Sequence, residues 1–395
     1  MKREKLLLLT LAAINFTHIV DFMIMMPLGP QLMRLFAISP QQFSALVSTY
    51  TFSAGVSSFI GAFVLDRFDR KKTLIIAYVG FVLGTFACAL APNYHLLLSA
   101  RIITGAFGGI LSALILSIVG DVIPEFRRAT AIGIVMGAFS VASIFGVPFG
   151  LFMANKFSWH APFIFLGSLS IAILGFVIWT LPKLRSHLSD DRKHPNPVKV
   201  LTSLARNSNQ LSALGFTIML VLGHFTIIPF LSPYMVSNVG FSESDLTYIY
   251  MLGGAVTIFT SPFIGRLADR IGKARVFTVL ALLALIPLFA LTNLPRTALP
   301  IALFVTTVFF ITSSGRWVPA TTMITSTVTP QSRGSFMSIN SSVQQLTAGI
   351  AASIAGVIVT RNAAGELVNY DYVGYLAIVV SLFGILVSRR LRTVS

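Results

Sequence analysis

The chain has 395 residues, of which 55% are hydrophobic and only 11% are charged, and its mean hydropathy is +0.83. Soluble domains carry roughly 25% charged residues, so this composition excludes a soluble globular protein and indicates an integral membrane protein. The formal net charge of +16 leaves nucleic-acid binding open until the basic residues are placed. The single cysteine, Cys88, excludes an internal disulfide and a cysteine-based zinc site.

Twelve segments are long and apolar enough to span a membrane, which takes about 20 mostly apolar residues. They lie at 6–28, 42–65, 73–91, 96–120, 130–153, 161–181, 211–234, 246–268, 276–293, 299–325, 335–360 and 372–388. The first begins like a signal peptide, but its apolar run continues to Leu28 without a small-residue cleavage site. We therefore predict an all-α membrane protein with twelve transmembrane helices, the first of them retained.

The 29 lysine and arginine residues are distributed unevenly over the loops. With the N-terminus inside, most of them fall on that side, and the outer loops hold only Arg34, Lys156, Arg296 and Arg361. Basic loops stay in the cytoplasm, so we predict a cell inner-membrane protein with both termini cytoplasmic. Because the basic residues are spread over many short loops, we expect the lipid bilayer and no nucleic acid as partner.

One long polar connection divides the chain nearly in half. It reads KLRSHLSDDRKHPNPVKVLTSLARNSNQ, residues 183–210, and follows the sixth predicted span. We predict a six-helix bundle over 1–182, a cytoplasmic linker over 183–210 and a second six-helix bundle over 211–395. Within the linker, residues 198–205 have the pattern of a short amphipathic helix that would lie on the inner leaflet.

Two pairs of loop motifs show that the halves are repeats. DRFDRKK (66–72) lies between spans two and three, and DRIGKAR (269–275) lies between spans eight and nine. PEFRR (124–128) follows span four, and PQSRG (330–334) follows span ten. Both pairs are separated by nearly the same interval, which indicates a duplicated six-helix unit. Parallel repeats with a binding site at their interface are an architecture of secondary transporters.

These motifs carry a family resemblance. GAFVLDRFDRKK and GRLADRIGKAR resemble the loop signature G-x-x-x-D-R-x-G-R-K of the major facilitator superfamily. RIITGAFGG (101–109) is similar to that family's span-four motif, and GVPFG (146–150) to the span-five motif of its exporters. The chain most resembles the twelve-helix drug:proton antiporters and arabinose-efflux-like permeases. The resemblance implies the major facilitator fold, alternating access of two bundles, and a monomer with no cofactor, driven by the proton gradient.

Two positions depart from the family pattern. Asp69 stands where the loop signature has glycine. Aspartate tolerates left-handed backbone better than most residues, so we expect the turn to be kept. The exporter motif usually reads G-P-x-x-G, whereas this chain has G-V-P-F-G.

The resemblance also implies a conformational latch. It places Asp66 and Arg70 in a charge cluster with the acid that ends span four, here Asp121; the cluster docks at the start of span eleven, where the helix dipole favours an acid, and holds the outward-open state. The latch candidates are Asp66, Arg67, Arg70, Asp121, Asp269, Arg270 and Lys273. Because the repeat sets Thr327 opposite Asp121, we expect a latch that is complete only in the first half. The alternative is that these loop cations only orient the chain.

Asp21 is an acid inside the first span, where an unpaired charge costs roughly 2.5–3.5 kcal/mol or more. His18 lies three residues before it and can share its helix face. At 1.5 Å per residue, Arg101 of span four lies at a similar depth. The three are candidates for proton coupling, because a carboxylate alternately exposed to water and to arginine can load and release a proton. The alternative is a static Asp21–Arg101 pair between helices.

Further polar residues within the spans are candidates for contact with substrate. They are Asn15, His224, Arg316, Asn340, Gln344 and Gln345. The alternative for a buried polar residue is a hydrogen bond that holds two helices together. With two arginines, Arg101 and Arg316, and one aspartate deep inside the spans, the cavity favours neutral or anionic compounds over dications.

Three pairs of glycines have the four-residue spacing that allows helices to pack closely. They are Gly105 and Gly109, Gly133 and Gly137, and Gly146 and Gly150. We expect Gly146, Pro148 and Gly150 to bend span five where the two halves meet.

The sequence therefore favours proton-coupled efflux of a small molecule: a drug-like compound, a sugar or a related metabolite. A proton-coupled uptake symporter or a facilitator is the alternative. The chain has no G-x-S-x-G, H-E-x-x-H or G-x-x-x-x-G-K-[ST] pattern, so we expect neither an enzyme nor an ATP-driven pump, and no metal. A receptor is disfavoured because no segment remains for a signalling domain.

Overall fold

A computed structural model of the chain describes residues 2–65, 68–181, 197–329 and 333–394. Twelve helical segments in these ranges are long and apolar enough to cross a membrane, which confirms the predicted number and the all-α class. The first half contains α1 (Lys2–Ile24), α2 (Gly29–Leu35), α3 (Pro40–Val64), α4 (Arg70–Ala89), α5 (Tyr94–Val122), α6 (Glu125–Val141), the π-helix η2 (Ala142–Gly146), α7 (Val147–Lys156) and α8 (Ala161–Thr180).

α9 (Pro197–Arg206) lies within the predicted linker. The second half contains α10 (Ser208–Phe225), α11 (Ile228–Tyr234), the π-helix η4 (Met235–Val239), α12 (Leu246–Ile271), α13 (Lys273–Thr292), α14 (Leu299–Gly315), α15 (Trp317–Thr325), α16 (Arg333–Ile358), β1 (Thr360–Arg361), β2 (Leu367–Val368) and α17 (Tyr370–Ser388). The amphipathic helix expected at 198–205 is therefore present as α9. The domain boundaries at 182 and 210 stay a prediction, and residues 182–196 lie outside the described ranges.

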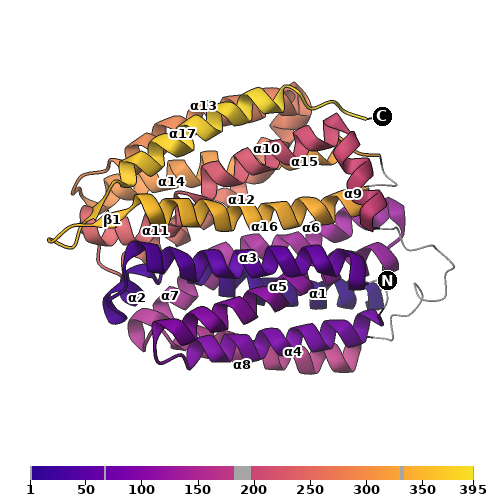
Figure 1. Cartoon of the computed structure of the whole chain (residues 1–395), viewed down its shortest axis with the longest axis horizontal. Helices are drawn as coiled ribbons and strands as arrows, with labels where there is room; N and C mark the ends of the chain where they lie inside the picture. The colour runs from indigo at the N-terminus through magenta and orange to yellow at the C-terminus, as the bar shows by residue number, and fades with distance from the viewer. Residues whose placement is uncertain (1, 66–67, 182–196, 330–332, 395) are drawn as a thin grey trace.

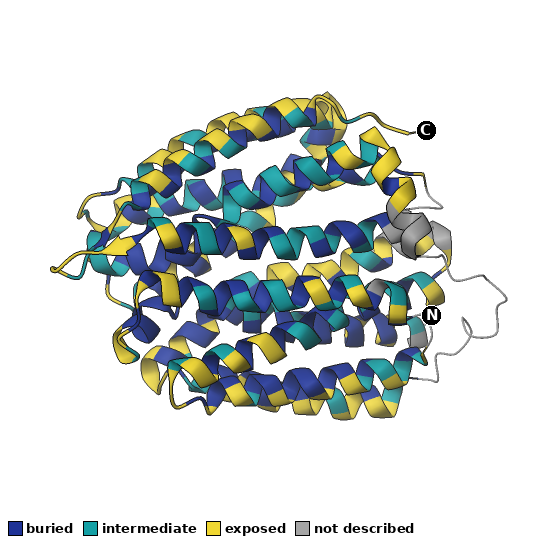
Figure 2. Cartoon of the chain, viewed as in Figure 1, coloured by how far each residue is buried: buried dark blue, intermediate teal, exposed yellow. Residues whose placement is uncertain are grey.

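Both chain ends lie at one end of the bundle, which we call the terminal face; α2, α11 and β1 lie at the opposite end, the distal face (Figure 1). The two halves lie one above the other in this view, with α3 and α16 side by side where they meet. Exposed residues run along the outermost helices (Figure 2). Many of them are large and apolar, including Trp179 in α8 and Phe259 in α12, as expected of surfaces that face lipid.

Polar side chains at the loops start several of the spanning helices. The Ser39 hydroxyl accepts a hydrogen bond from the Gln42 backbone N–H, and the Gln42 side chain accepts one from the Ser39 N–H. This capping box, followed by Pro40, fixes the start of α3. Asn93 caps α5 with a single bond, in which its side-chain oxygen accepts from the Leu96 backbone N–H.

The expected left-handed turn at Asp69 is wrong. Its φ is −59°, and its carboxylate accepts from the backbone N–H groups of Lys71 and Lys72, so that it caps α4. The loop therefore replaces the backbone freedom of glycine with a side-chain cap. In the second loop Gly272 does adopt a positive φ, of 101°, between α12 and α13.

The first span of each half is broken near the distal face, which corrects the predicted uninterrupted segments 6–28 and 211–234. α1 ends at Ile24, and α2 begins at Gly29 with Pro30 in its first turn. α10 ends at Phe225, and α11 begins with Pro229 in its first turn. Proline lacks a backbone N–H and fits only the first turn of a helix without loss. The sequence placed both spans correctly but did not reveal the breaks.

The fifth and tenth spans are also interrupted. η2 inserts a π-turn between α6 and α7, and Arg316 separates α14 from α15. Single π-turns commonly occur at functional positions, where they redirect side chains. The π-turn thus lies just before the segment 146–150, where the bend stays a prediction.

The apolar core shows how the halves are joined. Toward the distal face a single cluster contains residues of both halves, among them Leu28 and Phe43 from the first and Phe230 and Tyr250 from the second. Toward the terminal face each half has clusters of its own, one built around α1, α4 and α5 and another around α10, α13 and α15. The distal ends are packed together, whereas the terminal ends have separate cores.

A β-hairpin that the sequence did not predict covers part of the distal face. Thr360 pairs with Val368, and Arg361 pairs with Leu367. The Asn238 side chain donates to the Leu367 carbonyl and accepts from the Leu367 N–H, both at 2.9 Å, and so holds β2 against η4.

Glycines allow α5 to pack directly on α3. A Cβ at Gly109 would lie 2.1 Å from the Ala54 carbonyl oxygen, and one at Gly105 would lie 2.3 Å from the Tyr50 carbonyl oxygen. These two glycines are therefore needed for close helix packing, as predicted. The expectation for Gly133 and Gly137 is wrong, because a Cβ at either would meet no atom within 4 Å.

We expect Gly109→Ala to destabilise the protein, because the new methyl group would overlap backbone atoms of α3 and overpacking costs about 1–3 kcal/mol. Gly137→Ala is the matched control and should be neutral or slightly stabilising, since alanine favours helix more than glycine. The melting temperature of each purified variant in detergent measures this. Equal values for the two variants would contradict close packing of α5 on α3.

Candidate functional site

The centre of the first half contains a fully buried ion pair. Arg101 Nη1 lies 2.7 Å from Asp21 Oδ2, and both side chains have 0% exposure. The same nitrogen donates to the Asp21 carbonyl oxygen at 3.3 Å, and Thr85 donates to Asp21 Oδ1 at 3.3 Å. Asp21 of α1 thus joins α4 through Thr85 and α5 through Arg101. The structure thus brings Asp21 and Arg101 together as their matching depths predicted.

Tyr50 of α3 extends this group. Its ring covers the Arg101 guanidinium, with the carbon Cζ 4.3 Å from the ring centroid. Its hydroxyl donates to the His18 carbonyl oxygen at 3.5 Å. A buried cation gains most from an aromatic face when water is excluded. The sequence analysis missed Tyr50, because an aromatic residue in an apolar span gives no signal of its own.

His18 lies next to this group but makes different contacts. Its Nε2 is 3.1 Å from Asn15 Oδ1 and 3.2 Å from Ser112 Oγ, while its buried Nδ1 has no hydrogen-bond partner. Asn15 donates to the Val135 carbonyl of α6 at 3.0 Å. Polar groups therefore follow α1 from Asp21 toward the terminal face. Ser112 could have been found from sequence, because it follows Arg101 by eleven residues, close to three helical turns.

The second half contains a buried arginine in a different setting. Arg316 Nη1 donates to Ser381 Oγ at 3.0 Å, and Nη2 donates to the Gly223 carbonyl at 3.2 Å. His224, the next residue after Gly223, stacks on the Phe309 ring at 6.1 Å. The structure therefore groups two of the predicted substrate-contact residues, Arg316 and His224.

Three further substrate-contact candidates lie on α16. Asn340 is buried and accepts a hydrogen bond from Thr217 at 2.7 Å, which is the arrangement expected of a residue that holds α16 to α10. Gln344 and Gln345 are half-buried on α16. A role for these three in substrate contact stays a prediction.

The latch candidates are arranged asymmetrically. Arg70 Nε lies 2.9 Å from Asp121 Oδ2, so α4 and α5 are joined at the terminal face. In the second half Asp269 and Arg270 are exposed and Lys273 is half-buried. Asp66, Arg67 and residues 330–332, near which the latch was expected to dock, lie outside the described residues.

The span-five motif packs on both halves. A Cβ at Gly146 would lie 2.4 Å from Val20, and one at Gly150 would lie 2.7 Å from Ile24, so both glycines accommodate α1 of their own half. Pro148 is buried between them in α7. η2 and α7 also contact α12 of the other half; a Cβ at Gly254 of α12 would lie 3.0 Å from the Ile144 side chain.

Side chains on the distal face connect the halves, and we call this set the distal joint. The Arg34 guanidinium bonds the Glu243 carboxylate, and Asn155 donates to the Glu243 carbonyl at 3.2 Å. Two ring pairs add apolar contact across the halves: Phe43 with Phe230 at 6.0 Å and Phe22 with Phe225 at 6.1 Å.

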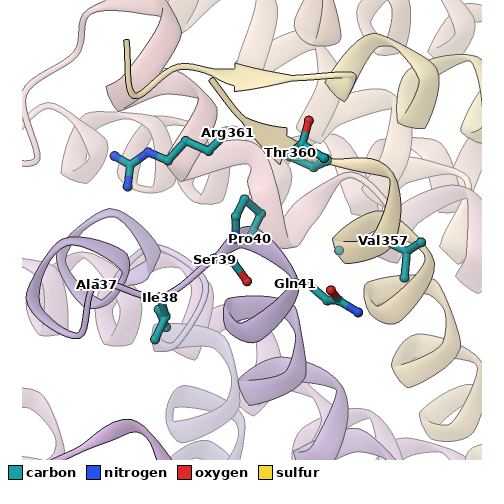
Figure 3. A pocket seen from close by; sticks show the side chains of 10 residues that line it. Ala37, Ile38, Ser39, Pro40, Gln41, Val357, Thr360 and Arg361 are labelled. Carbon is teal, nitrogen blue, oxygen red and sulfur yellow. The ribbon is translucent and has the colours of Figure 1, made fainter. Parts of the chain in front are cut away.

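A pocket of about 500 Å³ opens on the same face between the start of α3 and the end of α16. Figure 3 shows Ser39 and Pro40 on one side of it and Thr360 and Arg361 on the other. Its walls come from both halves of the chain.

Comparison with known proteins identifies the family. The profile of the Major Facilitator Superfamily matches residues 11–227 and 213–395. The chain therefore belongs to the major facilitator superfamily of membrane transporters.

Three Bacillus subtilis (strain 168) relatives illustrate the match, all of them uncharacterized MFS-type transporters. YceJ is 24% identical over 88% of this chain and 87% of its own length. YbcL is 24% identical over 80% of this chain and 78% of its own, and YtbD is 29% identical over 62% and 61%.

Solved structures share the fold. A bacterial homolog to the human lysosomal transporter Spinster, in an inward-facing and unoccupied conformation, has a TM-score of 0.76 and 18% identity over 98% of both chains. The inward-facing and occupied conformation has a TM-score of 0.69 and 17% identity over 97% of this chain and 93% of that one. The chain is thus a multi-pass membrane transporter with the major facilitator fold.

We expect Asp21→Leu and Arg101→Met each to destabilise the protein strongly, because each leaves the other charge buried and unpaired, at a cost of about 3–5 kcal/mol. The double variant should be more stable than either single variant, since it removes both charges together. Melting temperatures of the four proteins in detergent complete the double-mutant cycle. Additive losses would mean that the two side chains do not depend on each other.

Proposed function

We propose that this protein is a secondary active transporter that exports a small molecule across the cell inner membrane in exchange for protons. The observation that carries the proposal is the Asp21–Arg101 pair, a carboxylate and a guanidinium with 0% exposure inside the first half. Ionisable residues inside membrane spans are costly and usually serve the transport of ions or substrate.

The geometry supports a role for Asp21 in exchanging a proton. Ionised Asp21 holds Arg101 through Oδ2, and the Tyr50 ring covers the guanidinium. A proton on Asp21 removes the negative charge from the pair, so Arg101 keeps Tyr50 and the Asp21 carbonyl but loses its charged partner. Because the pair joins α1, α4 and α5, this change alters how those helices hold together.

His18 and Asn15 supply the polar groups between Asp21 and the terminal face. His18 lies one turn of α1 before Asp21, and Asn15 lies one turn before His18. An imidazole can accept a proton on one ring nitrogen and release one from the other, so we assign His18 a part in moving the proton between Asp21 and that face. Arg101 in turn is assigned to favour the ionised form of Asp21.

We also propose that the terminal face is cytoplasmic, as the distribution of lysine and arginine predicts. The arrangement is then inward-facing, because the distal joint closes the outer side while the halves have separate cores on the inner side. Alternating access requires the distal joint to open and the terminal ends to come together. Arg70 and Asp121 are assigned to the latch that holds that second state.

Proton movement in inverted membrane vesicles tests the coupling, with a pH-sensitive dye and a panel of drug-like compounds, sugars and sugar acids. A compound that wild type exports should release protons from acidified vesicles, and Asp21→Asn should lose at least nine-tenths of that signal because it has no carboxylate to titrate. Asp371→Asn is the matched control, since Asp371 is a carboxylate at the distal start of α17, and it should behave as wild type.

An equal signal from wild type and Asp21→Asn would overturn proton coupling through Asp21. Compound accumulation driven by an inward proton gradient in right-side-out vesicles would instead favour an uptake symporter.

The latch has its own test. We expect Arg70→Gln to slow transport several-fold, because it removes the charge that pairs with Asp121, and Arg270→Gln to leave transport near wild type, because Arg270 is exposed. Initial rates in vesicles with matched protein amounts measure both. Equal losses in the two variants would show that the loop cations act alike, as expected if they only orient the chain.

A further inference from the structure

We propose that Arg316 is the counter-ion for an anionic substrate, a carboxylate attached to an apolar body, bound inside the second half. This inference rests on the proposed transport function and names the class of molecule carried. It comes from a charge without a partner, from polar atoms left free beside it, and from comparison of the two halves.

Arg316 is buried without a negative charge beside it. Its exposure is 2%, and its two hydrogen bonds go to the neutral acceptors Ser381 Oγ and the Gly223 carbonyl. Among the described residues, no aspartate or glutamate forms a salt bridge with it, and its buried Nε has no partner at all. Buried guanidinium groups are normally paired with carboxylate or phosphate.

Further unused polar atoms come from the same group of helices. Ser313 has 0% exposure, its Oγ has no hydrogen-bond partner, and it precedes Arg316 by three residues, which sets both on one side of the helix. The buried Nδ1 of His224 also has no partner. Arg316 bonds the carbonyl of Gly223, the residue before His224, so the histidine is held next to the arginine. Three buried polar side chains from two helices therefore have unused hydrogen-bonding capacity.

Aromatic rings surround this polar group. The His224 ring lies 6.1 Å from Phe309, 6.3 Å from Trp317 and 5.4 Å from Phe225. Phe225 in turn packs on Phe22 of the first half at 6.1 Å, so the group extends to the boundary between the halves. A ligand that pairs with Arg316 would thus meet rings on its uncharged part, which favours an organic anion over a small inorganic one.

The repeat places a histidine where the first half has its buried acid. The interval that separates Asp66 from Asp269 is also the interval that separates Asp21 from His224. Arg101 bonds the backbone carbonyl of Asp21 as well as its carboxylate, whereas Arg316 bonds the backbone carbonyl next to His224 and finds no carboxylate. The first half thus pairs its buried arginine with its own acid, whereas the second half has a histidine in place of that acid and leaves the anion to be supplied by the substrate.

Ligand-dependent melting of the purified full-length protein in detergent tests the assignment. The probes are benzoate, phenylacetate, octanoate and decanoate, each compared with its own uncharged amide. We expect at least one acid to raise the melting temperature of wild type in a saturable manner, with its amide at least tenfold weaker. Arg316→Gln should weaken the acid at least tenfold, and Arg316→Lys, which keeps the charge, should weaken it less.

Two further variants separate the possible causes of weaker acid binding. Arg390→Gln removes an exposed positive charge and should bind the acid as wild type does, which excludes a general effect of net charge. Ser313→Ala leaves Arg316 and its two acceptors intact, so it remains informative even if Arg316→Gln fails to fold; we expect it to bind the acid several-fold more weakly. Acid binding is measured in detergent without a proton gradient, so a failure of proton coupling in vesicles and a failure of the anion site are distinguishable.

The proposal is wrong if no acid stabilises wild type more than its amide does. It is equally wrong if Arg316→Gln and Arg316→Lys both bind the acid with wild-type affinity.

Discussion

The ion pair between Asp21 and Arg101 is the constraint on which the first half depends. A carboxylate with 0% exposure in a membrane span must have a positive partner, and that partner fixes how deep α5 lies against α1. Close packing of α5 on α3 through Gly105 and Gly109 then places the Tyr50 ring over the Arg101 guanidinium. One electrostatic requirement thus relates the positions of α1, α3, α4 and α5.

The two halves have the same helix order but differ in how their charged residues are paired. Both begin with a broken helix, at 25–28 in the first and at 226–227 in the second. The first half neutralises its buried arginine and forms the Arg70–Asp121 pair at the terminal face. The second half leaves Arg316 with neutral acceptors and keeps Asp269 and Arg270 at the surface. Duplication has kept the backbone while the chemistry of the two copies has diverged.

The sequence predicted the features that follow from composition and spacing. These are the twelve spans, the repeat, and the contact between Asp21 and Arg101, which lie at the same depth. It did not predict the breaks before α2 and α11, because proline in a membrane helix is compatible with a kink as well as an end. Tyr50 and Thr85 were missed because only the packed helices set them beside the ion pair. Gly133 and Gly137 had the right spacing but face open space, since spacing does not say which face meets a neighbour.

The distal pocket has a practical consequence. One wall belongs to the start of α3 and the other to the end of α16 and β1, so the pocket has this shape only while the two halves touch at the distal face. An antibody fragment with a loop that fills the pocket would therefore recognise one conformation and not the other. Such a fragment would report the fraction of molecules closed on that side and would hold them there for imaging.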